Sequence, residues 1–163
     1  MSTNRFLTIM LCAFSVTACN PFHKNQAVNL SPGDATLNSM WHANLASPAS
    51  LAGVVQMNGS ASMAPDPGNT HTVINISLAN ASPGGLHPWE AHEGQCSPGS
   101  DYGVLGSSDA YGQMKVDSDG RAMGEATIPM RTPRSGSYFV VVYASEANSR
   151  MVVACGNLAA PTR

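Results

Sequence analysis

The sequence predicts an all-β domain, folded as a β-barrel or β-sandwich of about eight strands. Three observations support this fold class. Short apolar or alternating runs recur along the chain, turn-forming residues separate them (15 glycines and 11 prolines among 163 residues), and no segment carries the apolar stripe of an amphipathic helix. Many short strands with Gly- and Pro-rich turns are typical of sandwiches and barrels.

The first 18 residues are expected to be a lipoprotein signal peptide. One positive charge precedes an apolar run at 6–16, which is too short for a membrane-spanning helix. Residues 16–19 (VTAC) resemble the bacterial lipobox, in which the cysteine is acylated and becomes the mature N-terminus. We therefore predict lipidation of Cys19, with an ordinary signal peptide and an incidental cysteine as the alternative. Because Asn20 follows instead of aspartate, the resemblance implies an outer-membrane lipoprotein on the periplasmic face of a bacterial cell envelope.

The part after Cys19 divides into a tether at 19–35 and a single domain at 36–163. The tether contains two prolines and no sustained period. In the domain, two short segments at 40–45 and 53–57 are candidate strands, and a Pro- and Gly-rich turn follows at 65–69. Residues 73–78 (VINISL) then alternate apolar and polar side chains, as a half-buried strand does.

Five further strands complete the predicted sheet. The PGG sequence at 83–85 turns the chain into a strand at 86–92. The DSDG sequence at 117–120 separates strands at 113–116 and 121–127, which predicts a hairpin. The apolar run at 138–143 (YFVVVY) indicates a core strand, and 151–154 is the last strand.

Composition excludes several classes of function. Eight Lys and Arg residues spread along a chain of net charge −2 form no basic patch, which argues against nucleic-acid binding. An apolar fraction of 43% argues against disorder of the whole chain. Since no GxSxG elbow and no free cysteine nucleophile are expected, nucleophilic hydrolysis has no support.

The cysteine count predicts one disulfide. Of four cysteines, Cys12 leaves with the signal peptide and Cys19 is expected to be lipidated. Cys96 and Cys155 then remain in a compartment that oxidises thiols, so we predict that they pair. A two-cysteine metal site is the alternative, although no CxxC spacing supports it.

Three landmarks resemble the Cu,Zn superoxide dismutases. Residues 85–93 (GLHPWEAHE) are similar to the copper-ligand strand of that family, whose motif reads roughly G-x-H-G-F-H-V-H-E, and Cys96 follows as the first disulfide cysteine does. Residues 117–122 (DSDGRA) are similar to the family's D-x-D-G-x-A hairpin, and 154–156 (ACG) to its closing A-C-G. The resemblance implies an eight-stranded antiparallel Greek-key barrel.

The same comparison of motifs implies that most metal ligands of the family are missing. Glu90 replaces the first of two copper-ligand histidines, His92 retains the second, and Tyr143 occupies the place of a late-strand histidine. Segment 97–112 contains no histidine, so the bridging and zinc histidines are absent. Asp109 lies near the family's zinc aspartate, and Arg150 lies two residues before the place of its substrate-guiding arginine. We therefore expect no dismutase activity of the usual kind.

Glu90, His92 and Tyr143 are the candidate metal ligands. Glu90 and His92 are two residues apart on a predicted strand and therefore share one face. With Tyr143 they would form an O,N,O site that suits zinc or Cu(II) better than a copper ion that changes oxidation state. The alternative is a hydrogen-bond network that remains after ligand loss. By the resemblance, His87 packs behind the site in a structural role, and Trp89 packs in the core.

Methionine offers a second set of candidate ligands. The chain has nine, of which Met1 and Met10 leave with the signal peptide. Thioethers favour Cu(I), and with histidine they also ligate haem iron. The alternative is core packing, for which methionine is well suited. The seven that remain are Met40, Met57, Met63, Met114, Met123, Met130 and Met151.

Three functions follow from these observations. The first is a non-catalytic, superoxide dismutase-like lipoprotein that acts as a binding or scaffold protein, toward a protein partner or the envelope itself, as a monomer or homodimer. The second is a periplasmic protein that binds or carries a metal (copper or zinc) or haem through its His, Glu, Tyr and Met side chains. The third is a residual superoxide dismutase with altered ligands. The sequence favours the first, because the ligands for redox chemistry are lost.

Overall fold

A computed structural model describes residues 40–54, 56–97 and 103–161 of the chain. The predicted signal peptide at 1–18, the lipidation of Cys19 and the tether at 19–35 lie outside the described residues. No helix within the described part is long and apolar enough to cross a membrane. The helical elements are η1 (Ala49–Leu51) and η2 (Ser108–Ala110), and the strands are β1 (Trp41–Ala46), β2 (Asn58–Pro65), β3 (Thr72–Ala79), β4 (Leu86–Glu93), β5 (Gln113–Lys115), β6 (Ala122–Ile128), β7 (Tyr138–Ser145) and β8 (Asn148–Leu158).

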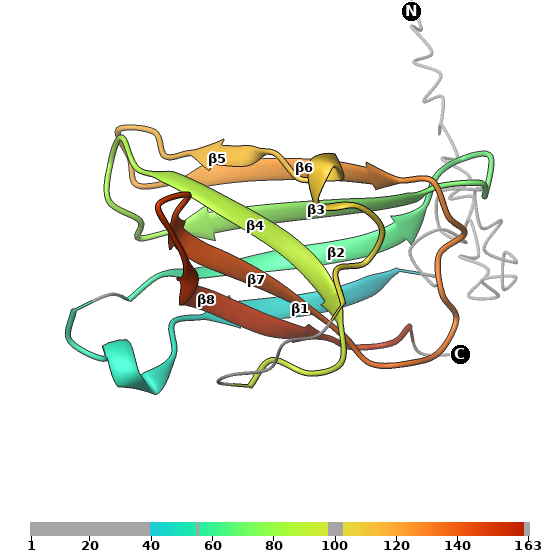
Figure 1. Cartoon of the computed structure of the whole chain (residues 1–163), viewed down its shortest axis with the longest axis horizontal. Coiled ribbons are helices and arrows are strands. Elements are labelled where there is room, and N and C mark those ends of the chain that lie inside the picture. Colours follow the sequence, from blue (N-terminus) through green and yellow to red (C-terminus); the bar gives the residue numbers. More distant parts are fainter. Residues whose placement is uncertain (1–39, 55, 98–102, 162–163) are drawn as a thin grey trace, which may run out of the picture.

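The eight strands form one antiparallel sheet that curls into a nearly closed barrel (Figure 1). Their order is β5-β4-β7-β8-β1-β2-β3-β6, so β5 and β6 are its two end strands. The connections from β3 to β4 and from β6 to β7 join strands that are not neighbours, as Greek-key connections do. The predicted fold class, an all-β barrel or sandwich, is confirmed.

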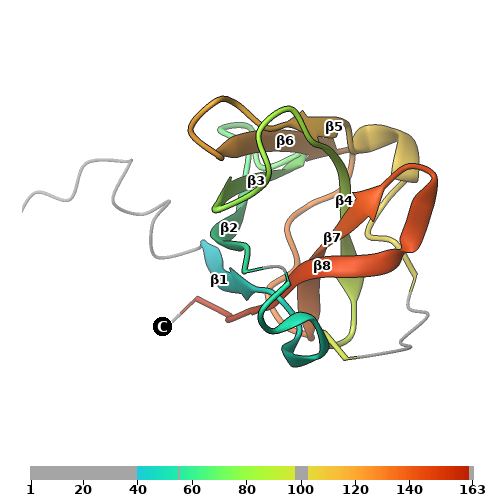
Figure 2. The same ribbon diagram turned by 90° about the vertical axis from the view of Figure 1, so that its left-hand side faces the viewer.

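Two predicted strands have the wrong bounds. The described residues of segment 53–57, namely 53, 54, 56 and 57, belong to no strand. A turn at 52–54 follows η1, and Gly53 has a φ of +83°, a left-handed conformation that interrupts pairing. The second strand instead runs through Asn58–Pro65 (NGSASMAP), whose small side chains give a weak apolar alternation. The last strand is longer than the predicted 151–154, because a two-residue turn at 146–147 lets β8 pair along most of β7 (Figure 2).

The predicted hairpin between β5 and β6 is wrong, although its turn is present. The carboxylate of Asp117 accepts hydrogen bonds from the backbone N–H groups of Asp119 (2.9 Å) and Arg121 (2.8 Å). Beyond the turn the strands separate, because β5 pairs with β4 and β6 pairs with β3. In the described part of the chain no backbone ladder joins β5 to β6, so the turn connects the two ends of the sheet.

Side chains close the barrel between those two ends. Trp89 of β4 is 1% exposed, and a Cβ added to Gly124 of β6 would lie 2.7 Å from its Nε1. The same added Cβ would lie 3.0 Å from Cγ of Met114 on β5. The ring of Tyr111 meets Trp89 edge-on at a centroid distance of 5.1 Å. The predicted core position of Trp89 is confirmed, and its ring fills the space that backbone pairing leaves open.

A close approach of β8 to β1 gives a first test of the barrel. A Cβ on Gly156 would overlap the backbone carbonyl oxygen of Asn44. We expect Gly156→Ala to lower the free energy of unfolding by about 1–3 kcal/mol, since the strands must move apart. Urea unfolding measures this loss. Gly112→Ala is the matched control, because an added Cβ there meets nothing within 4 Å; equal losses in both variants would contradict the close approach.

Candidate functional site

The predicted ligand strand places its polar side chains on the outside of the barrel. Trp89 and Ala91 of β4 point into the core, so Glu90 and His92 share the outer face. On this face, the strand register sets His92 opposite Phe139 of β7. The two rings stack with centroids 5.2 Å apart and planes 18° from parallel. His92 is only 8% exposed, so this part of the outer face is covered.

The chain that follows β4 returns along the edge of β4 that does not pair with β7. The N–H of Glu93 donates to the carbonyl of Gly103 (3.1 Å), and the N–H of Leu105 donates to the carbonyl of Ala91 (2.8 Å). His92 also forms an isolated β-bridge with Val104. The returning segment therefore runs alongside β4 next to His92.

A disulfide fixes the start of this segment to the last strand. Cys96 and Cys155 are bonded with a Cα–Cα distance of 6.1 Å, which confirms the predicted pairing. The backbone N–H of Cys96 also donates to Oδ1 of Asn157 at 2.7 Å. Both links join the segment after β4 to β8, two strands away in the sheet.

The three predicted ligands lie together on the outer face. Oε2 of Glu90 is 3.2 Å from Nε2 of His92, and the hydroxyl of Tyr143 is 3.3 Å from the same nitrogen. Tyr143 comes from β7, the neighbour of β4, and its side chain is half-buried. The side chain of Glu90 is 22% exposed, so the cluster is open to solvent on that side.

Glu90 and Tyr143 each approach Nε2 of His92 at a distance that can be compared with the spacing of metal ligands. When four ligand atoms surround zinc at about 2.0–2.1 Å, neighbouring ligand atoms lie about 3.3–3.4 Å apart. The observed separations of 3.2 and 3.3 Å are close to this value and also lie at the upper end of the range of ordinary hydrogen bonds. Within the described residues, no group of three or more His, Cys, Asp and Glu side chains lies close enough to hold a metal. The phenol of Tyr143 is therefore needed to complete a set of three donors.

His87 supports the site from behind. This side chain is buried, and its Nδ1 donates to the backbone carbonyl of Tyr143 at 3.0 Å. The bond ties β4 to β7 directly at the residue that supplies the phenol. It supports the structural role predicted for His87. Its Nε2 is buried, has no hydrogen-bond partner among the described residues, and lies 3.0 Å from where a Cβ on Gly85 would be.

Tyr111 is a neighbour of the site that the sequence did not reveal. Its hydroxyl donates to the carbonyl of Leu105 at 2.7 Å, within the segment that returns beside β4. Burial raises the pKa of the Tyr111 phenol, a hydrogen bond with the backbone of Ala91 offsets part of this, and the charge of Glu90 raises it further. The phenol of Tyr111 therefore stays protonated, and its hydroxyl fixes the backbone of Leu105 in the segment that returns beside β4. No local pattern marks it, because the contact depends on where the chain returns.

Other residues singled out in the sequence occupy separate places. Asp109 is exposed in η2, and Arg150 is exposed on β8 near its turn with β7. Three methionines belong to the buried core cluster inside the barrel, namely Met57, Met63 and Met114. Core packing therefore accounts for these three, as the alternative interpretation of the methionines predicts.

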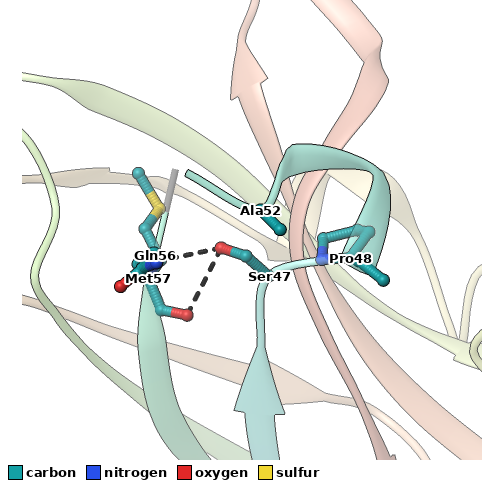
Figure 3. A pocket seen from close by; sticks show the side chains of 6 residues that line it. Ser47, Pro48, Ala52, Gln56 and Met57 are labelled. Carbon is teal, nitrogen blue, oxygen red and sulfur yellow. Dashed lines mark hydrogen bonds between the residues drawn. The ribbon is translucent and has the colours of Figure 1, made fainter. Parts of the chain in front are cut away.

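A shallow pocket lies between the end of β1 and the start of β2 (Figure 3). The hydroxyl of Ser47 donates to the carbonyl of Val153 at 2.8 Å and accepts from the N–H of Met57 at 2.9 Å. Its hydrogen-bonding capacity is thus used within the protein. The lining carries no charge and consists of Ser47, Pro48, Ala49, Ala52, Gln56 and Met57. The cluster around His92 is chemically the stronger candidate.

No protein-family model matches this chain, and no curated protein matches it either.

Proposed function

We propose that this chain is a superoxide dismutase-like envelope lipoprotein that binds one divalent metal ion, Cu(II) or Zn(II), and does not catalyse dismutation. The observation that carries the proposal is the convergence of two oxygen donors on Nε2 of His92 at ligand-like separations. Glu90, His92 and Tyr143 are the proposed ligands. Solvent or a partner supplies the fourth position.

Three features support the relationship to the dismutases. The motif strand β4 carries its two candidate ligands on the outer face of the barrel. The disulfide joins the segment after that strand to the last strand, between the two cysteines that match the family's pair. The turn at 117–120 links the two ends of the sheet in a Greek-key barrel. Each feature is weak alone, and their shared order along the chain gives them weight.

The donor set argues against redox turnover. Dismutation requires a copper ion that is stable in both oxidation states, and neutral imidazoles suit both. In this cluster one imidazole stands beside a carboxylate and a phenol, which are oxygen donors that favour divalent ions. The proposed role is therefore to bind an ion, without using it as a catalyst.

Neighbouring groups orient the proposed ligands before an ion arrives. The ring of His92 is buried and stacked on Phe139, and its backbone is bridged to Val104. The backbone of Tyr143 is held by His87. Groups of this kind around a metal site typically account for about 10- to 100-fold in affinity. The site can thus bind an ion with little loss of side-chain freedom.

Calorimetric titration of the purified protein with Cu(II), Zn(II) and haemin tests this function. We expect one Cu(II) or Zn(II) to bind with a dissociation constant below about 1 μM. His92→Ala should weaken binding by at least about 100-fold, because it removes the central ligand. His42→Ala is the matched control: His42 lies exposed on β1, three strands from β4 in the sheet, and its loss should leave the affinity unchanged.

Two results would contradict the proposal. One is the absence of any Cu(II) or Zn(II) binding tighter than micromolar, which would favour the scaffold function toward a protein partner. The other is superoxide dismutation by the copper-loaded protein above the rate of free copper, which would restore an enzymatic role.

A further inference from the structure

We infer that the site is selective for the oxidised form of copper, so that reduction to Cu(I) releases the ion. The inference rests on the proposed function and adds a mode of regulation to it. Copper is then a cargo, which the protein takes up as Cu(II) and gives up when a reductant is present.

The chemistry of the donors is the first reason. A carboxylate, a phenol and one imidazole meet around Nε2 of His92. Oxygen and imidazole donors suit Cu(II), whereas Cu(I) is selected by thiolates and thioethers. Adding one electron to the ion thus removes much of its affinity for Glu90 and Tyr143.

The placement of sulfur is the second reason. Cys96 and Cys155 are bonded to each other, so neither offers a thiolate. Met57, Met63 and Met114 belong to the core cluster inside the barrel, while the proposed ligands lie on its outer face. Among the described methionines that are well exposed, Met123 lies on β6, which forms no described backbone ladder with β4 or β7.

Met151 is the remaining exposed methionine, on β8. Its sulfur accepts a hydrogen bond from Nδ2 of Asn148 at 3.5 Å, at the turn between β7 and β8. Val152, and not Met151, is the register partner of Tyr143. Register shifts lie on both sides of this pair, so the sulfur of Met151 is placed by its hydrogen bond to Asn148 and not by strand alternation.

The release step balances without any change in the protein's covalent bonds. A one-electron reductant such as ascorbate supplies one electron to Cu(II), and Cu(I) leaves the site. The phenolate of Tyr143 takes a proton from solvent, and the His92 nitrogen returns to its hydrogen bonds. The exposed side of Glu90 provides the way out. The disulfide of Cys96 and Cys155 is not consumed.

Anaerobic dialysis of the full chain tests the inference. Protein loaded with one equivalent of Cu(II), or of Zn(II), is dialysed with and without ascorbate, and the retained metal is measured. We expect ascorbate to lower copper retention by at least about 10-fold and to leave zinc unchanged, because Zn(II) has no accessible lower oxidation state. The zinc-loaded sample thus controls for any effect of ascorbate on the protein itself.

Variants of two tyrosines on β7 sharpen the test. Tyr143→Met replaces the phenol with a soft thioether and should raise the retention of copper in ascorbate by several-fold. Tyr138→Phe is the matched control, because the Tyr138 hydroxyl bonds to Ser135 and its ring packs against Trp41, away from the site. Its copper retention should equal that of the parent protein in both conditions.

The outcomes separate the inference from the function on which it rests. Equal copper retention with and without ascorbate would overturn the selectivity and leave metal binding intact. Loss of both Cu(II) and Zn(II) before ascorbate is added would overturn the proposed function itself. Release of copper with ascorbate but not of zinc, reversed by Tyr143→Met, supports both.

Discussion

Replacing both Cys96 and Cys155 with serine is expected to lower the free energy of unfolding by about 4 kcal/mol. The bonded cysteines are 59 residues apart, and a cross-link over such a loop removes that much chain entropy from the unfolded state in the loop-closure description. In this description the loss arises in the unfolded chain, which gains conformational freedom when the cross-link is absent. Urea unfolding monitored by tryptophan fluorescence measures the change.

The parent protein under reducing conditions is the matched control for this variant. Reduction should produce the same loss as the double substitution, since both remove only the bond between β8 and the segment after β4. A difference of less than about 1 kcal/mol between the double variant and the oxidised parent would contradict the account. It would mean that the segment is held mainly by its backbone hydrogen bonds to β4.

Trp89→Ala is expected to lower the free energy of unfolding by about 3–5 kcal/mol. Trp89 is 1% exposed and lies where β5 and β6 form no ladder, against Gly124 and Tyr111. Truncation leaves a cavity at the one seam of the barrel that backbone pairing does not close. Equilibrium unfolding in urea gives the loss.

A double-mutant cycle of Trp89 and Gly124 tests whether packing between β4 and β6 accounts for this loss of stability. Gly124→Ala adds a methyl group that would lie 2.7 Å from Nε1 of Trp89, so it should destabilise the parent protein. In a Trp89→Phe background, which still folds around a large ring, the same change should cost less by about 1 kcal/mol or more. Additive losses would show that Trp89 does not pack on Gly124.

The apolar pattern along the chain predicts most strands of the sheet, but it does not show which faces of a strand are buried. The YFVVVY run predicts a core strand, and Val140 and Val142 do belong to the core cluster inside the barrel. Phe139 and Val141 point to the outer face and are buried there as well. The run is apolar at every position because both faces of β7 are buried, and periodicity along the chain does not reveal what buries the second face.

Short sequence patterns did not predict strand pairing, because the partner of each strand depends on the whole fold. The DSDG turn is encoded locally, since the Asp117 carboxylate caps it. Which strand each arm pairs with depends on β3 and β4, which lie elsewhere in the sequence. The second strand was missed because its side chains are mostly Ser, Ala and Gly, which give little apolar contrast between the two faces.

The candidate site was predictable to the same limited extent. The spacing of Glu90 and His92 on a strand predicts a shared face, and the structure places their side chains in contact. Tyr143 entered only through the resemblance to the dismutases, because it is 51 residues away from His92 in sequence. The structure brings its hydroxyl to His92, whereas the support from Tyr111 depends on the path of the returning segment.

Electron paramagnetic resonance of the protein with one equivalent of Cu(II) tests the central claim most directly, because nitrogen couplings count the imidazoles bound to copper. With His92 as the imidazole ligand beside Glu90 and Tyr143, the account predicts a bound Cu(II) signal coupled to a single imidazole nitrogen. Coupling to three or more nitrogens, or the spectrum of free Cu(II), would contradict it.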